Sequence, residues 1–520
     1  MFDWFKRMFG GIEKKPRTSS RMYGAAKQSR LTTGWGVTNS SADSELHQSL
    51  TGLRSRSRQL IRDASYAKRA RTLVVNNVVG NGIGLQAQVK GARGGVLKRV
   101  NQEIEDAWKT WSKAQYCHTG GRLHFKMFER QVMAQVFEAG DCFIRMHPIR
   151  FGDSPVPLAL ELIESERVTD EYTAPFMRRN EGTQIRMGVE VDDRYQRPVA
   201  YHIRNHHPGE FQYYGEVGFE EVERVPAEYI IHVGMIDRWP QTRGEPWLHA
   251  AARRLNDLDG YSEAEIVKAR VQASMPFTIE TPQASTSLGE EQEDGSVEMT
   301  LEPGIAQRLS PGEKFNNPPP AAPNTAMDPF MRYMLREIAS GVGVSYESLS
   351  RDYSQSNYSS SRLALLDDRD LWRVLQTWFI CDFRERLHDM WMQQAVLSRA
   401  VPSVSIEDFA SNPSKFTQVR FKPRGWTWVD PSKEISAFQD SIKSGFSTVS
   451  DVIAQTGGGL DLQDVLEQRE QELALMKEKG IVFETSPEFY KDKKPNAAKP
   501  KSQPTEPDED DTPRIYSVRK

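Results

Sequence analysis

The chain has few cysteines and no long apolar run. Its 520 residues include only three cysteines, at positions 117, 142 and 381, with no CxxC pair and no histidine at ligand spacing. This excludes a disulfide framework and a structural zinc site, and is typical of a protein made in a reducing compartment. No stretch approaches the roughly 18 to 20 apolar residues that span a bilayer, and MFDWFKRMFGG is too short and interrupted for a signal peptide. We therefore expect no membrane partner.

Signatures of common enzyme classes are also missing. The sequence has no GxxxxGK[ST] loop, no HExxH and no GxSxG. The glycines of NNVVGNGIG fail as a dinucleotide fingerprint because the third required glycine falls on Leu85, and the following LQAQVK alternates like a strand. We expect no cofactor and no catalytic residue.

Metal sites have only weak candidates. Two acidic pairs could hold divalent metals in a nuclease: Glu138 with Asp141, and Glu161 with Glu164. Both fall on stretches that fit solvated faces equally well. The histidines of YHIRNHHPGE lack a carboxylate at ligand spacing, which favours surface histidines. We expect no metal.

Positive charge gathers near the N-terminus. The net charge is −3, but residues 1–80 contain 15 Lys and Arg against 5 Asp and Glu. Residues 1–50 lack sustained periodicity and are interpreted as a basic, partly disordered arm. A helical pattern follows from Leu53 to Val79, with Arg54, Arg58 and Arg62 as a possible basic contact helix. The asymmetry indicates either an anionic partner or a solvated arm.

The middle of the chain predicts an α+β fold. Residues 97–140 are helical in pattern, whereas DCFIRMHP, LALELI, GVEVD, PVAYHIRN and YIIHV alternate as strands. One helix then spans Pro246 to about Ser274, roughly 40 Å long. Strand patterns in PFTIET and VEMTLEPG, separated by an acidic segment and followed by KFNNPPPAAPN, predict a small β insertion before a helix that starts at Met327.

A polar segment separates that helix from a longer one. Residues 345–361, SYESLSRDYSQSNYSSS, include eight serines and three tyrosines. Structureless loops beyond about 12 to 15 residues are uncommon in compact domains and usually have a function. The next helix runs from about Leu363 to Ser398, about 50 Å. No lysine or histidine lies at a catalytic offset from the serines, so they are contact groups and not nucleophiles. Helices return over 431–480, and a tail rich in proline, lysine and acid is expected to be disordered.

Several strings in this order resemble the portal proteins of lambda-like tailed bacteriophages, which form the ring at the unique capsid vertex. The resemblance covers about residues 50–480. Its strings are NNVVGNGIGLQ, VEVDDRYQRPVAYHI, VPAEYIIHV with RGEPWLHAAARRLNDLDGYSEAE, LEPGIAQRLSPGEKF, SGVGVSYESLSRDYSQSNYSSSRLALLDDRD and PRGWTWVDPSKE. None is a catalytic signature, but six in sequence with matching spacing are specific.

The resemblance implies a portal-protein fold with an α/β wing, long stem helices, a small β clip and a helical crown. The expected parts are a basic arm (1–50), wing (51–243), first stem helix (244–274), clip (275–326), second stem helix (327–343), tunnel loop (344–362), long helix with return to the wing (363–430), crown (431–485) and disordered tail (486–520).

The resemblance also implies a function and partners. The expected protein is a homododecameric ring, made in the host bacterial cytoplasm and found at the portal vertex of the virion, through which double-stranded DNA is packaged and ejected. Implied partners are further copies of the chain, the large terminase subunit, major capsid and scaffold proteins, and head-completion or tail adaptor proteins.

Movement of DNA through a channel requires contact without sequence readout, which hydroxyls, amides and a few cations provide. Strong cationic binding would oppose sliding. The expected DNA-contacting residues of the tunnel loop are Ser350, Arg351, Tyr353, Ser354, Gln355, Asn357, Tyr358 and Arg362. Two alternatives stay open: the loop is a flexible surface connector, or the chain is a DNA-processing enzyme or nucleic-acid adaptor that acts as a monomer or dimer.

Overall fold

The computed structural model describes most of the chain between residues 39 and 481. The described ranges are 39–91, 94–171, 182–210, 222–273, 277–280, 290–291, 297–298, 306–309, 326–426, 431–456 and 462–481, together with residues 30, 34 and 36. The chain divides into two units, residues 1–424 and 425–520. Most of the predicted arm and clip and the whole predicted tail lie outside the described residues.

The first helices that the structure describes are α2 (Ala42–Asp63) and α3 (Ser65–Val78), where one helical run was predicted. The α2 helix starts eleven residues before the predicted start, capped by Ser41, whose side chain accepts a hydrogen bond from the Ser44 amide. Leu46 and Leu50 are buried in α2. Residues 42–50 are therefore helical, not part of an extended arm, because they have an apolar face to bury.

Two antiparallel sheets form the β part of this unit. The first has β2 (Asp141–His147) between β3 (Ala159–Ile163) and β8 (Ile230–Gly234). The second has the order β4 (Thr183–Arg186), β5 (Val189–Asp192), β6 (Pro198–Arg204) and β7 (Val222–Pro226). Their inward side chains share one core of Phe143, Ile163, Val168, Val189, Val191, Tyr201, Ile203, Val225 and Ile230. All five strings predicted as strands lie on strands, which confirms the α+β class.

The first unit also contains further helices and short segments. They are α4 (Lys98–Trp111), α5 (Ala114–Cys117), α6 (Phe125–Ala139), α12 (Ile406–Ser411), α13 (Pro413–Phe416), and the 3-10 turns Ser165–Arg167 and Ala227–Tyr229. The α6 helix packs on β2. A separate pair, β1 (Gly84–Ala87) and β13 (Val419–Lys422), joins distant parts of the chain in antiparallel register.

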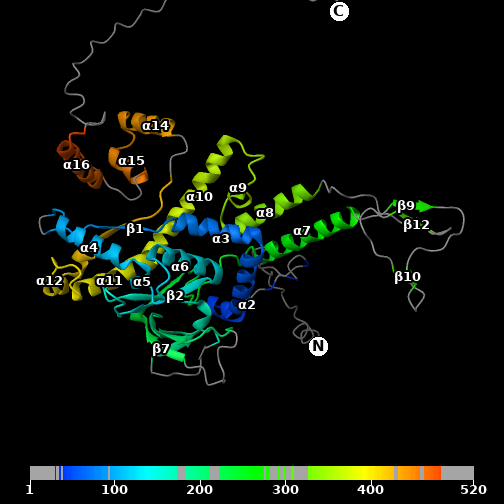
Figure 1. The fold of residues 1–520 in the computed structure, drawn as a ribbon, viewed down its shortest axis with the longest axis horizontal. Helices are drawn as coiled ribbons and strands as arrows, with labels where there is room; N and C mark the ends of the chain where they lie inside the picture. Colours follow the sequence, from blue (N-terminus) through cyan, green and yellow to red (C-terminus); the bar gives the residue numbers. More distant parts are fainter. Residues whose placement is uncertain are drawn as a thin grey trace, which may run out of the picture. The chain divides into compact units, whose positions relative to one another are not determined.

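Helices α7 (Ala252–Ala273) and α8 (Met327–Val342) lie side by side (Figure 1). An ion pair joins them, with Arg254 Nε 2.8 Å from Glu337 Oε1. Turns occupy residues 247–251, so α7 starts later than the predicted helix from Pro246. Between α7 and α8, β9 (Phe277–Glu280) pairs in parallel with β12 (Ala306–Leu309), and β10 (Glu290–Glu291) pairs with β11 (Val297–Glu298). A β insertion between two helices is thereby confirmed.

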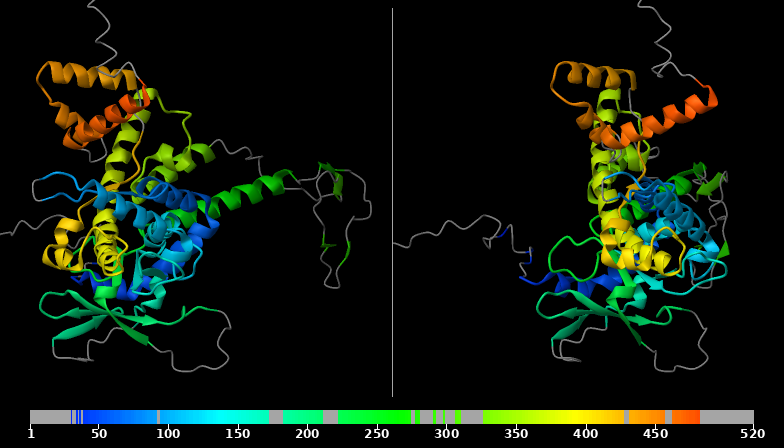
Figure 2. Two further views of the ribbon diagram at one scale, coloured as in Figure 1. Left: turned by 60° about the vertical axis from the view of Figure 1, so that its left-hand side comes forward. Right: turned by 90° about the vertical axis from the view of Figure 1, so that its left-hand side faces the viewer.

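The long helix is continuous but not uniform (Figure 2). It consists of α10 (Tyr358–Phe379), a π-helical segment (Ile380–Glu385) and α11 (Arg386–Leu397), which together measure about 60 Å. It starts five residues before the predicted Leu363. The π segment was not predicted. It widens one turn, and both Phe383 and Arg384 are buried there.

The second unit is helical, as predicted, with α14 (Pro431–Lys443), α15 (Val449–Thr456) and α16 (Leu462–Lys479). Residues 457–461, which include Gly457, Gly458 and Gly459, lie outside the described residues. Across the helices that the structure describes, none is both long and apolar enough to cross a membrane.

Candidate functional site

About half of the polar segment 345–361 is helical. A short helix, α9 (Tyr346–Ser350), follows Ser345, whose hydroxyl caps it by accepting from the Ser348 amide. The α10 helix begins at Tyr358 after a capping box at Asn357. Only residues 351–357 connect the two helices. The prediction of a seventeen-residue loop without structure was therefore wrong, because local caps at both ends extend helix into the segment.

The first half of the segment is fixed by Asp368 of α10. The Asp368 carboxylate accepts from the Ser345 amide at 2.8 Å and from the Ser345 and Ser348 hydroxyls, each at 2.7 Å. From the other side, Arg69 of α3 donates to the Ser348 carbonyl through Nε at 3.3 Å and Nη2 at 3.1 Å. Leu349 is also buried. Residues 345–350 thus belong to the folded body.

The second half is organised by Asp352. Its carboxylate accepts from the Ser354 hydroxyl at 2.6 Å and the Tyr346 hydroxyl at 2.8 Å, and lies 3.4 Å from Arg332 Nε of α8. The hydrogen bonds from Ser354 and Tyr346 lower the pKa of Asp352 to about 2. The carboxylate is therefore ionised at neutral pH, and it holds the connecting residues beside α8.

Three of the predicted contact residues use their side chains inside the segment. The Ser350 hydroxyl donates to the Tyr346 carbonyl, that of Ser354 to Asp352, and the Asn357 side chain accepts from the Ser360 amide. These groups shape the segment, so they offer fewer contacts to a partner than the sequence suggested.

The other predicted contact residues differ in exposure. Arg351, Tyr353 and Gln355 are exposed, and Tyr353 is 60% exposed. Arg362 lies in α10 and is partly buried, and the side chain of Tyr358 lies outside the described part of the structure. Ser354 and Asn357 are exposed too, so the connection presents one cation, one phenol, one hydroxyl and two amides.

The three arginines of the predicted contact helix do not share a surface. Arg54 is 1% exposed, and its Nε donates to the Ala139 carbonyl at 3.2 Å. Arg58 Nη2 forms an ion pair with Glu166 at 2.9 Å. Only Arg62 is well exposed, next to Asp63. The structure thus removes Arg54 from any contact face, because it serves the protein interior.

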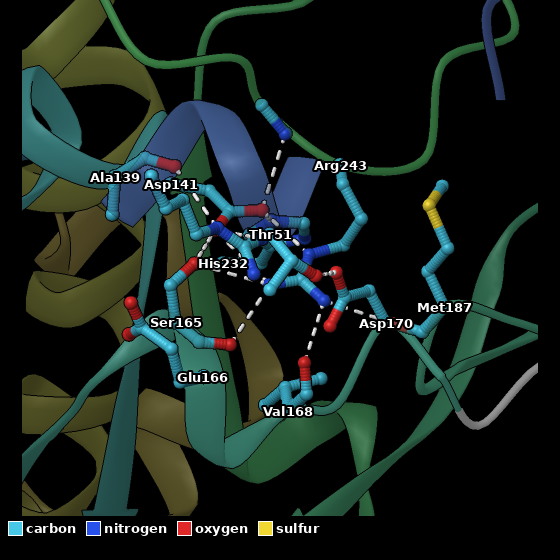
Figure 3. Close-up of polar contacts among 12 residues, drawn as sticks. Thr51, Ala139, Asp141, Ser165, Glu166, Val168, Asp170, Met187, His232 and Arg243 are labelled. Carbon is cyan, nitrogen blue, oxygen red and sulfur yellow. Dashed lines mark hydrogen bonds and ion pairs between the residues drawn. The ribbon is translucent and has the colours of Figure 1, made fainter. Parts of the chain in front are cut away.

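Arg54 belongs to a buried charge cluster around Asp141 at the start of β2 (Figure 3). Asp141 accepts from Arg243 Nε at 2.6 Å, from the Gly244 amide at 3.1 Å and from the Ser165 hydroxyl. Arg243 also donates to the carbonyls of Val168 and Met187 at 2.7 and 2.9 Å. This single guanidinium therefore links β2 to loops of both sheets.

The cations of the cluster decide its protonation. Burial alone raises the pKa of Asp141, but Arg243, the hydrogen bond with His232 and the charge of Arg54 together hold it well below its usual range. Asp141 is fully buried. Both predictions for Asp141, a metal ligand or a residue on a solvated face, were wrong, because it forms a structural ion pair with Arg243. The two residues are 102 positions apart, so only the fold shows that they meet.

The remaining metal candidates also have protein partners. Glu138 pairs with Arg71, Glu161 with Arg167, and Glu164 with Arg58. His202 is buried with Nε2 3.3 Å from Glu190, so the surface interpretation was wrong for this histidine. Among the described residues, no group of three or more His, Cys, Asp or Glu side chains could hold a metal ion.

Comparison with known families and proteins gives one consistent match. The family model described as "Phage portal protein, lambda family" matches residues 28–376. A probable portal protein of Halomonas phage phiHAP-1 is 30% identical over 482 residues, covering 90% of this chain and 89% of that protein. Portal protein B of Escherichia phage lambda is 22% identical over 476 residues, covering 86% of this chain and 88% of that protein.

Similarities to solved structures are more distant. The neck of an empty GTA particle, at 14% identity, matches with a TM-score of 0.38, covering 78% of this chain and 92% of that one. The virion of a native gene transfer agent particle matches with a TM-score of 0.36 at 12% identity, covering 81% of this chain and 94% of that one.

Proposed function

The chain belongs to the lambda family of phage portal proteins, and from this premise we propose that twelve copies form a ring whose channel conducts double-stranded DNA during packaging and ejection. A portal protein is the head–tail connector at the portal vertex of the virion. We assign α7 and α8 to the stem, residues 275–326 to the clip and residues 431–485 to the crown. The proposed role is structural and not catalytic.

The proposed partners follow from this position. The clip would meet the large terminase subunit during packaging and the head-completion or tail adaptor proteins afterwards. The wing and crown would contact major capsid and scaffold proteins. In a closed ring each subunit uses two different surfaces for its two neighbours, so the ring contacts are heterologous.

One observation carries the assignment of the channel surface. Residues 351–357 present Arg351, Tyr353 and Gln355 on a base that Asp368 and Arg69 hold. Neutral hydrogen-bonding groups contact phosphates without reading sequence. Because few of these groups are charged, the salt-dependent attraction that opposes sliding stays small. This chemistry suits DNA that must move.

The test is a double variant, Tyr353→Ala with Gln355→Ala, in the full chain. We expect rings with a central hole in negative-stain images, as for the unmodified protein, but less nuclease-resistant DNA in assembled particles. Tyr195→Ala is the matched control, because Tyr195 is 62% exposed in the wing against 60% for Tyr353. Normal packaging by the double variant would refute the assignment of residues 351–357 to the channel surface. A monomeric chain that cleaves DNA with added metal would overturn the structural role itself.

A further inference from the structure

A groove lies along the C-terminal half of α11, where α12 packs beside this helix (Figure 1). Its volume is about 720 Å³, within the roughly 300 to 1,000 Å³ of clefts that hold ligands. Leu397 of α11 and Ile406 of α12 line it and are 52% and 48% exposed. Met390, Val396 and Phe409 extend the apolar lining. Single exposed apolar side chains are common on protein surfaces, but several around one groove form a surface that suits an apolar partner.

Two carboxylates line this groove as well, those of Glu228 and Asp389. Across the residues that the structure describes, neither forms an ion pair. Arg386 also lines the groove, and its Nη2 donates to the Ile230 carbonyl at 3.4 Å. Partial burial and then the charge of Glu385 raise the pKa of Asp389, so a cation beside this carboxylate would be stabilising. The groove therefore suits a partner that combines an apolar face with cations.

Two further hollows link this groove to the start of α2. The first, about 350 Å³, is lined by Ser41 and Asp43, and by Arg186 and Pro240. The second, about 250 Å³, shares Arg186 and Pro240 with the first hollow and Arg386 with the groove. Ser41 is the N-cap of α2, so the chain that precedes α2 joins the first unit at one end of this series of hollows. The groove lies at the other end.

The sequence of residues 1–9, MFDWFKRMF, has the composition that the groove requires. In a helix, four of its apolar residues would share one face at the spacing i, i+3, i+4 and i+7: Met1, Trp4, Phe5 and Met8. Lys6 and Arg7 would lie at the two borders of that face. An amphipathic helix that buries its apolar face in a groove is a recurring mode of peptide recognition. Residues 10–40 can extend to about 100 Å, so the segment can reach the groove along the hollows.

We propose that residues 1–9 dock as a short helix in the groove of α11 and α12 of their own chain. Trp4 and Phe5 would cover the apolar lining at Leu397, and the two cations of the segment would face the two carboxylates of the groove. Burial of the apolar side chains drives the docking, and the opposite charges fix its direction. This contact fastens the start of the chain to the first unit, and it does not depend on whether the channel conducts DNA.

The test is disulfide trapping in the full-length chain, with Cys381→Ser to remove the exposed native thiol. Phe5→Cys is combined either with Leu397→Cys in the groove or with Val374→Cys as the matched control. Val374 is 64% exposed and lies about 35 Å from Leu397 along the same continuous helix. Mild oxidation is followed over time by non-reducing electrophoresis, and peptide mapping identifies the linked residues. A segment that does not dock would reach both positions at similar rates.

We expect trapping at position 397 to occur within single chains and about tenfold faster than trapping at position 374, because docking raises the local concentration of the thiol. Trp4→Ser should slow trapping at position 397 about tenfold, because it removes the largest apolar group of the segment. Trp35→Ser, the same change outside the segment, should leave that rate unchanged.

The charged contacts have their own test in the same assay. Lys6→Glu with Arg7→Glu should slow trapping at position 397, because like charges then meet in the groove. Adding Glu228→Lys with Asp389→Lys should restore the rate, since the charges are opposite again. A rate that stays low after the second pair of changes would contradict the proposed direction of docking.

Three results would overturn the docking itself. Equal trapping rates at positions 397 and 374 would refute it. Links that join two chains, seen as a doubled mass, would assign the groove to the N-terminal segment of a neighbouring copy and not of the same chain. A rate at position 397 that Trp4→Ser leaves unchanged would show that apolar contact is not the cause. If Leu397→Cys disturbs folding, Ile406→Cys, on the same groove, takes its place.

Discussion

His388 should make the fold sensitive to mild acid. Its imidazole is 1% exposed in α11, with ring centroids 5.9 Å from Trp391 and 6.1 Å from Trp108. Neither ring nitrogen has a hydrogen-bond partner among the described protein groups. Burial, and then the charge of Arg384, lower the pKa of His388 to about 3. A proton on this ring would be buried without compensation.

The direction of the effect follows from the two states. In the unfolded chain the ring titrates near pH 6.5, whereas in the folded chain it stays neutral down to about pH 3. Folding therefore favours the neutral form. The stability from this difference is fully present above pH 6.5 and is lost as the pH falls toward 3. The slope is about 1.4 kcal/mol per pH unit, which gives a loss of about 2 kcal/mol between pH 6.5 and 4.5.

The assay compares the unmodified chain with His388→Phe by urea unfolding, followed by tryptophan fluorescence. Trp108, Trp111 and Trp391 surround the site, so the signal reports on this core. We expect His388→Phe to lose about 2 kcal/mol less between pH 6.5 and 4.5. His388→Leu serves if the phenylalanine variant fails to fold. Contributions of other groups, such as His232, are common to both proteins and cancel. Equal losses in the two proteins would refute the argument.

Two further predictions concern the junction of β2 with the residues before α7. Asp141→Asn leaves the buried guanidiniums of Arg243 and Arg54 without a counter-charge and should destabilise the fold by about 3 to 5 kcal/mol in urea unfolding. The control, Asp370→Asn, breaks the exposed pair with Arg373 and should barely change the free energy of unfolding. An unchanged free energy of unfolding for Asp141→Asn would contradict the structural role of the cluster. Gly140→Ala would place a Cβ in steric conflict with the Gly244 carbonyl oxygen, whereas Gly121→Ala, also at positive φ, meets nothing within 4 Å. Thermal unfolding should show a far larger loss of stability for Gly140→Ala, and equal losses would mean that the backbone contact does not matter.

Periodicity and composition explain what could be predicted. Strands β2, β5, β6 and β8 are rich in β-branched and aromatic residues, which is visible in the sequence. The structure buries consecutive residues in β2 and β5, so both faces of these strands are covered. Helix α8 shows an apolar repeat whose C-terminal part is buried, at Met334, Leu335 and Ile338. In α10 the buried apolar positions are Trp372, Leu375 and Phe379, in its second half. Helix α9 shows no such repeat, since five residues with a single buried leucine, Leu349, cannot display one. Its stability comes from Asp368, which is distant in sequence.

Prediction from the sequence failed mainly for buried charged residues, which it placed on contact surfaces or solvated faces. A sequence shows that Arg54 is charged but not that Asp141, 87 residues later, will meet it. One signal was available. The buried residues Leu46, Leu50, Arg54, Ser57 and Ile61 of α2 follow helical spacing, so Arg54 lies on the buried stripe, whereas Arg62 does not. A charged residue on an apolar stripe predicts an internal partner more strongly than an external one.

The polar segment therefore has two parts that should respond differently to force. Residues 345–350 are held by three charge-assisted hydrogen bonds to the buried Asp368, and such bonds are strong when shielded from water. Residues 351–356 are held to α8 chiefly by the partly exposed Arg332–Asp352 pair, and exposed pairs contribute little. A pull on the connection would break the Asp352 contact first, while Arg69 and Ser348 stay in place. In the channel that we propose, such a segment would yield locally to moving DNA while residues 345–350 keep their contacts.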